Sequence, residues 1–103
     1  MRQSELYAFN KLLKTLVLEP RFNGEFTKDQ NWEDVPFKDL KVLKVPCFGK
    51  PEKSYRNFST PPNWFQILKC VDEILVINDD YHHKWIGGFT NRGRGTYYVG
   101  TES

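Results

Sequence analysis

Cysteine is scarce in this sequence, and a long hydrophobic run is absent from it. Cys47 and Cys70 are the only cysteines among 103 residues, and they belong to no Cys-x-x-Cys pair. Neither a structural zinc site nor a disulfide-rich secreted scaffold is indicated, so two free thiols are expected. The longest apolar run is the four residues 74–77, whereas a membrane-spanning helix needs about 20. Residues 1–5 lack the pattern of a secretory signal, so we expect a cytoplasmic protein without a membrane partner.

Sequence motifs that would fix a reaction are also missing. Gly93-x-Gly95 lacks the third glycine and the following helix of a dinucleotide-binding turn. Neither a P-loop, a Gly-x-Ser-x-Gly elbow nor a His-Glu-x-x-His pair is present. The spacing of potential ligands matches no structural zinc pattern. We therefore expect no cofactor and no metal ion, and an enzyme is the minority interpretation.

Aromatic residues are abundant, at 16% of the chain, and hydrophobic residues make up 39%. Disordered chains are poor in both, so a folded protein is expected, and the length suits one domain covering residues 1–103. The net charge is only +2 but is unevenly distributed. Residues 38–56 carry six basic residues against two acidic ones, and residues 57–80 carry one against four. This distribution predicts a basic face and an acidic face.

Hydrophobic periodicity predicts helices mainly in the first two thirds of the chain. One helix is predicted over residues 4–19, with Pro20 ending it. Its apolar positions are Leu6, Phe9, Leu13 and Leu16. A second helix is predicted from Thr60 as the N-cap, with Pro61 at the first helical position, to about Asp72.

Strands are predicted at the C-terminal end. Residues 73–78 resemble a central strand, although a helix continuing through Ile77 remains an alternative. After a polar turn, residues 82–90 and 96–100 are predicted as two further strands, joined by the glycine-rich tip 91–95. The predicted fold is α+β: a small single domain in which two or three helices pack on an antiparallel C-terminal β-meander.

Four further stretches have a less definite pattern. Asn23-Gly24 suits a tight turn between two short extended pieces, and residues 37–45 fit either a helix or an extended segment. Residues 46–62 read as a long loop, a feature that is often functional in a small domain. Gly87-Gly88 indicates a bulge or a close backbone approach rather than a ligand site.

Two stretches, the long loop and the glycine-rich tip, combine cations with aromatic rings. On a single-stranded nucleic acid, rings stack on bases and cations follow the phosphates, and arginine offers a planar fork for phosphate. A protein partner suits the same residues, and so does an ordinary packed loop or turn. The predicted binding residues are Lys50, Lys53, Tyr55, Arg56, Arg92, Arg94, Tyr97 and Tyr98.

His82 and His83 are the only histidines, and their unperturbed pKa suits proton transfer near neutral pH. On a strand they point to opposite faces, so they do not form an acid–base pair with each other. A ribonuclease needs no protein nucleophile, because the RNA 2′-hydroxyl attacks, and one histidine would suffice as its base. Its other groups would be Glu73 or Asp80 on the histidine, and Arg92 and Arg94 on the phosphate.

Three hypotheses follow. The first is a small cytoplasmic accessory protein that binds nucleic acid, or a nucleic-acid-handling protein, through the basic, aromatic-flanked surface. In one version it inhibits an enzyme, with the acidic residues of segment 72–80 mimicking nucleic acid. The second is a small metal-independent ribonuclease of toxin type, and the third is a structural subunit of a larger assembly. Small chains rich in lysine and aromatic residues are common among accessory proteins of viruses and mobile elements.

Overall fold

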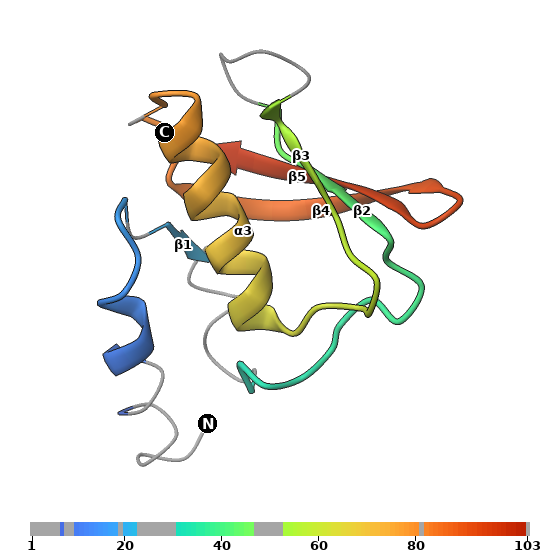
Figure 1. Cartoon of the computed structure of the whole chain (residues 1–103), viewed down its shortest axis with the longest axis horizontal. Coiled ribbons are helices and arrows are strands. Elements are labelled where there is room, and N and C mark those ends of the chain that lie inside the picture. The colour runs from blue at the N-terminus through green and yellow to red at the C-terminus, as the bar shows by residue number, and fades with distance from the viewer. Residues whose placement is uncertain are drawn as a thin grey trace.

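The computed structural model describes residues 7, 10–18, 20–22, 31–46, 53–80 and 82–102. In this part of the chain α3 and five strands form (Figure 1), and residues 10–13 are also helical. The elements are β1 (Arg21–Phe22), β2 (Val42–Lys44), β3 (Tyr55–Asn57), α3 (Trp64–Ile77), β4 (Trp85–Gly93) and β5 (Thr96–Glu102). The predicted α+β class is confirmed. No helix of the described ranges is long and apolar enough to cross a bilayer.

The strands form one mixed sheet in the order β1-β4-β5-β2-β3. The β4–β5 and β2–β3 pairs are antiparallel, whereas the β1–β4 and β2–β5 pairs are parallel. The predicted C-terminal meander is therefore wrong in its topology. The β4–β5 hairpin is local, whereas the strands on either side of it, β1 and β2, come from earlier parts of the chain.

Residues 73–78, predicted as a strand, belong almost entirely to α3, which confirms the alternative of a helix continuing through Ile77. The helical spacing of Leu68, Val71 and Leu75 continues through this stretch, and all three side chains are fully buried. A helix with apolar residues around most of its circumference needs neighbours on more than one side. The sheet supplies one neighbour, and the buried Leu16 of the N-terminal segment belongs to the same core.

The N-cap of α3 is Asn63, and not Thr60 as predicted. Asn63 and Gln66 form a reciprocal capping box, in which each backbone N–H donates to the other side chain at 2.8 Å. This arrangement satisfies two N–H groups, which a single threonine hydroxyl cannot do. At the other end the chain leaves the helix through the predicted polar turn, where Asp79 has a positive φ of 53°.

The predicted helix over residues 4–19 is shorter on its C-terminal side than expected. Residues 10–13 are helical, and the chain then turns away. The backbone N–H groups of Val17 and Leu18 donate to the carboxylate of Asp72 in α3, at 3.0 and 2.6 Å. Because these N–H groups bond to a side chain, they do not continue a helix. The first residues of the predicted helix lie outside the described ranges.

The remaining local predictions have mixed outcomes. Extended structure is confirmed at β1 and for residues 42–44, whereas the predicted turn at Asn23-Gly24 lies outside the described ranges. The predicted loop 46–62 contains β3, so it is not one loop. The register of β4 against β5 shifts between Ile86 and Gly88, which confirms a bulge there.

α3 packs on one face of the sheet and lies in front of β4 and β5 in Figure 1. The side chains directed to this face are buried: Leu43, Ile86, Tyr97 and Val99. Because successive side chains of a strand point to opposite faces, the residues between them project from the other face. We call that second face the open face.

Candidate nucleic-acid interface

The open face carries rings and cations in alternation across four adjacent strands. Tyr55 of β3 pairs with Lys44 of β2, Lys44 pairs with Tyr98 of β5, and Tyr98 pairs with Thr90 of β4. Arg92 follows Thr90 by two positions and contacts the same Tyr98 ring. We call Tyr55, Lys44, Tyr98 and Arg92 the ring–cation row. With adjacent strands about 4.8 Å apart, the row extends over roughly 14 Å.

Both cations of the row make cation–π contacts with the Tyr98 ring. The guanidinium carbon of Arg92 lies 4.9 Å from the ring centroid, and Nζ of Lys44 lies 5.5 Å from it. Both distances fall within the range of about 6 Å for cation–π attraction. Lys44 and Arg92 come from the strands on either side of β5, so the ring stands between them. The two positive charges are therefore held in place before any anion binds.

The exposed residues of the predicted binding set lie in this row or near its ends. Tyr55 is 44% exposed, and Arg94 is exposed at the hairpin tip. Lys53 is exposed just before β3, where its carbonyl accepts a hydrogen bond from Asn78 at 3.0 Å. Lys50 lies outside the described residues.

Two of the predicted binding residues face the helix instead. Tyr97 is only 7% exposed: its ring stacks on Phe37, with centroids 4.6 Å apart, and its hydroxyl donates to Asp39 at 2.6 Å. The hydrogen bond to Asp39, together with burial, raises the pKa of the Tyr97 phenol. Arg56 forms an ion pair of 2.6 Å with Glu73 of α3. The predicted stacking role of Tyr97 is wrong, because Tyr97 belongs to the core.

The hairpin tip is tighter than the predicted residues 91–95. Gly93, Arg94 and Gly95 all have positive φ, and only the last two lie between the paired strand ends. A Cβ atom on Gly95 would lie 2.8 Å from the carbonyl oxygen of Asp39. The carbonyl of Gly95 in turn accepts the N–H of Lys41 at 2.8 Å. Gly95 is therefore required by packing against the start of β2, while the Arg94 side chain remains exposed.

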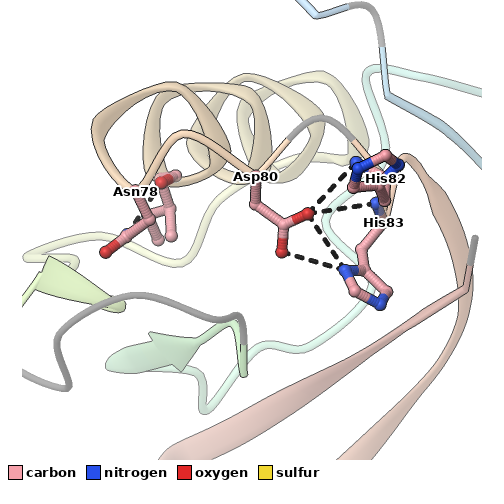
Figure 2. Close-up of polar contacts among 5 residues, drawn as sticks. Asn78, Asp80, His82 and His83 are labelled. Atoms are coloured by element: carbon pink, nitrogen blue, oxygen red, sulfur yellow. Dashed lines mark hydrogen bonds and ion pairs between the residues drawn. The ribbon is translucent and has the colours of Figure 1, made fainter.

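The histidines lie before β4 and not on a strand, so the predicted strand placement is wrong. Nδ1 of His83 lies 2.9 and 3.0 Å from the two carboxylate oxygens of Asp80 (Figure 2). The backbone N–H groups of His82 and His83 donate to the same carboxylate. Burial alone would raise the pKa of Asp80, but the hydrogen bonds from both histidines and the charge of His83 outweigh it. The pKa of Asp80 is therefore lowered.

Of the hypothetical ribonuclease site, the structure assembles only the pair of His83 and Asp80. Arg92 lies seven residues along β4 from Trp85, which itself follows the histidines. At about 3.3 Å per residue, the hairpin tip is roughly 20 Å from the start of the strand. The structure therefore does not bring the histidines and the two arginines around one substrate phosphate.

Acidic side chains of segment 72–80 form hydrogen bonds and an ion pair with other groups of the protein. Asp72 is 3% exposed and accepts the two N–H groups of the N-terminal segment, and Asp80 is 4% exposed and accepts three hydrogen-bond donors. Glu73 is paired with Arg56. The carboxylates of Asp72, Glu73 and Asp80 are thus engaged internally. The version of the first hypothesis in which this segment mimics nucleic acid is not supported.

Metal binding and thiol chemistry have little basis in the described ranges. There, no group of three or more His, Cys, Asp or Glu side chains is placed to hold a metal ion. Cys70 is a free, buried thiol, and burial raises its pKa to about 12. Because the thiolate is the reactive form, Cys70 is inert at neutral pH. Cys47 lies outside the described residues.

Sequence reasoning did not place Lys44 or Trp85 on the binding surface. Lys44 lies in a segment that fits a helix as well as a strand, and its partner strands are distant in the sequence. Trp85 is 47% exposed on the open face, since the adjacent Ile86 points into the core. The signal available for a strand was the β-branched Val42 and Val45 before Pro46, in a segment too short to separate the two structures.

Comparisons of this chain with protein-family models, with curated proteins and with solved structures find no match. The residues of the open face are therefore the basis for a functional argument.

Proposed function

We propose that the protein is a binding module for single-stranded nucleic acid and that the ring–cation row is its contact surface. One observation carries the proposal. The register of β3, β2, β5 and β4 brings Tyr55, Lys44, Tyr98 and Arg92 side by side on the face opposite α3.

The chemistry of the row matches what an unpaired strand presents. Lys44 and Arg92 are positive and face the same side of the sheet, so they complement consecutive phosphates. The exposed ring of Tyr55 offers a surface for a base, and such stacking is worth about 1–3 kcal/mol per base. A duplex hides the faces of its bases, so the ring at the end of the row favours a single strand.

The positive charge of the row supports a nucleic acid over a protein partner. Both of its charged residues are positive, and the exposed Arg94 and Lys53 near its ends add the same sign. The cations are pre-positioned by Tyr98, which reduces the conformational entropy lost when they bind an anion. A protein partner for the same surface would need a complementary acidic patch, and it is the alternative outcome of the test.

The test is titration of labelled single-stranded RNA, single-stranded DNA and duplex DNA at about 50 and 200 mM salt, the range over which phosphate-dominated binding weakens strongly. We expect single strands to bind more tightly than duplex and to lose affinity with salt. Lys44→Ala combined with Arg92→Ala should weaken binding and reduce the slope of log K against log salt by about 1.4, the value for two phosphate contacts on a single strand.

The matched control is Lys14→Ala combined with Lys69→Ala. It also removes two exposed positive charges, but from the N-terminal segment and from α3, on the helix side of the sheet. Equal weakening in both double variants would mean that the open face is not the contact surface. Absence of binding to every nucleic acid would point to a protein partner. The same samples run on a denaturing gel test the ribonuclease hypothesis, which predicts shortened RNA.

A further inference from the structure

We infer that the nucleic-acid path continues beyond the ring–cation row to the opposite end of the hairpin, where Trp85 stacks on a further base. The inference rests on the proposed function and extends it to a second contact.

Trp85 is exposed and belongs to the same face as the row. It pairs across the hairpin with Glu102, which lies four residues beyond Tyr98 on β5. At about 3.4 Å per residue, the Trp85–Glu102 pair lies roughly 14 Å from Tyr98 along the strands. The buried Trp64 packs in the core, and the half-buried Trp32 has its ring edge-on to Phe65.

Between Trp85 and Tyr98, the open face of the hairpin carries glycines and so exposes its backbone. Gly88 and Gly100 pair with each other there, and they are the pair between Trp85 and Tyr98 that lies on the open face. A Cβ atom on Gly88 would meet nothing within 4 Å, and one on Gly100 would make only ordinary contacts, the nearest at 3.6 Å. Neither residue has a positive φ.

The fold therefore has no steric need for glycine at these two positions, although glycine in a strand interior costs stability. Gly87 differs, because its Cβ would lie 2.6 Å from Oε1 of Glu102 at the bulge. Glycine in a strand can mark a place where another chain approaches the backbone closely. On this face, between two rings and beside two cations, the approaching chain that fits is the nucleic acid.

The charges assign different roles to the two ends of the path. Lys44 and Arg92 contact phosphates at one end. At the other end Glu102 pairs with Trp85 across the hairpin, and its carboxylate, which lies against Gly87, disfavours a phosphate there. Recognition at Trp85 is therefore by stacking of the indole ring, which contributes affinity with little salt dependence.

The first experiment compares Trp85→Leu with Trp85→Phe, using a labelled single-stranded oligonucleotide at two salt concentrations. Trp85→Leu should weaken binding about fivefold or more, the effect of losing one stacked base, without changing the salt slope. Trp85→Phe keeps a ring, so it should bind more tightly than Trp85→Leu. We expect nucleic acid to quench the tryptophan fluorescence of the native protein, and this quenching should be largely lost in Trp85→Phe.

The second experiment fills the bare backbone. Gly88→Val should keep or raise the melting temperature, because valine favours strands and meets open space, and yet it should weaken oligonucleotide binding. Gly88→Ala should show the same effects to a smaller degree. Loss of binding with unchanged stability separates an obstructed path from a damaged fold.

Failure of the inference is distinguishable from failure of the proposed function. Normal affinity in both Trp85→Leu and Gly88→Val, with weakened binding in the Lys44 and Arg92 double variant, would overturn the extended path and leave the ring–cation row in place. If no oligonucleotide binds the native protein even at low salt, the proposed function and the path are both overturned.

Discussion

The guanidinium group of Arg92 lies over the ring of Tyr98, with 4.9 Å between the guanidinium carbon and the ring centroid. Lys44 approaches the same ring, with its Nζ at 5.5 Å from the centroid. A neutral aromatic residue therefore organises both cations of the proposed interface. Binding should depend on this ring even though it carries no charge.

Tyr98→Leu should reduce affinity for single-stranded nucleic acid severalfold, because Lys44 and Arg92 lose the surface that holds them. Tyr98→Phe keeps the ring and should bind nearly as tightly as the native protein. Fluorescence anisotropy with a labelled oligonucleotide measures both. A Tyr98→Leu variant of native affinity would show that the cations act without the ring.

Asp72 should be a major determinant of stability. Its buried carboxylate accepts the N–H groups of Val17 and Leu18, so Asp72→Ala leaves both donors without their acceptor. We expect a loss of about 2–3 kcal/mol in the free energy of unfolding, measured by urea denaturation. Asp72→Asn retains one acceptor oxygen and should lose less. Equal stability of Asp72→Ala and the native protein would contradict this role.

The capping box gives a paired test at the start of α3. Asn63→Ala removes the side chain that accepts the N–H of Gln66, and it should destabilise the protein by about 1 kcal/mol. Thr60→Ala, at the position that the sequence favours as the cap, should change stability by less than about 0.5 kcal/mol. Thermal or urea unfolding of the two variants checks the assignment, which a reversed order of stabilities would refute.

The lowered pKa of Asp80 predicts the direction of one pH effect. A carboxyl group whose pKa is lower in the folded than in the unfolded state stabilises the fold above its unfolded pKa. That contribution is lost as the pH falls from about 4 through the lower folded pKa. In melting curves from pH 7 to pH 2, Asp80→Asn should be less stable than the native protein at neutral pH. The difference in melting temperature between the variant and the native protein should narrow in acid. A constant difference would argue against a stabilising contribution from the ionised Asp80.

Glycines in the hairpin should differ sharply in their tolerance of a side chain. Gly95 has a φ of 79°, and its Cβ would lie 2.8 Å from the carbonyl oxygen of Asp39, so Gly95→Ala should cost about 1–3 kcal/mol. Gly88→Ala meets open space at an ordinary φ and should be neutral or stabilising. Equal melting temperatures of the two variants would contradict the structure of the tip.

Features that depend on neighbouring residues could be read from the sequence. The α+β class, the β4–β5 hairpin with its positive-φ glycines, the bulge near Gly87 and the polar turn after α3 were all predictable. Each of these follows from local periodicity or from the conformational freedom of a few residues. The arginines at the tip and Tyr55 could be proposed for binding on the same basis, and that role remains a prediction.

Features that depend on contacts between distant segments could not be predicted from the sequence. The alternation of a strand places Tyr97 and Tyr98 on opposite faces, but only packing of α3 decides that Tyr97 is buried. The N-terminal helix ends where the N–H groups of Val17 and Leu18 bond to Asp72, a residue more than fifty positions away. The sequence determined which local structures each segment favours, because propensity and turn chemistry act over a few residues. The tertiary structure decided which strands are neighbours, and so which rings and cations share the open face, because strand register is fixed by burial across the whole domain.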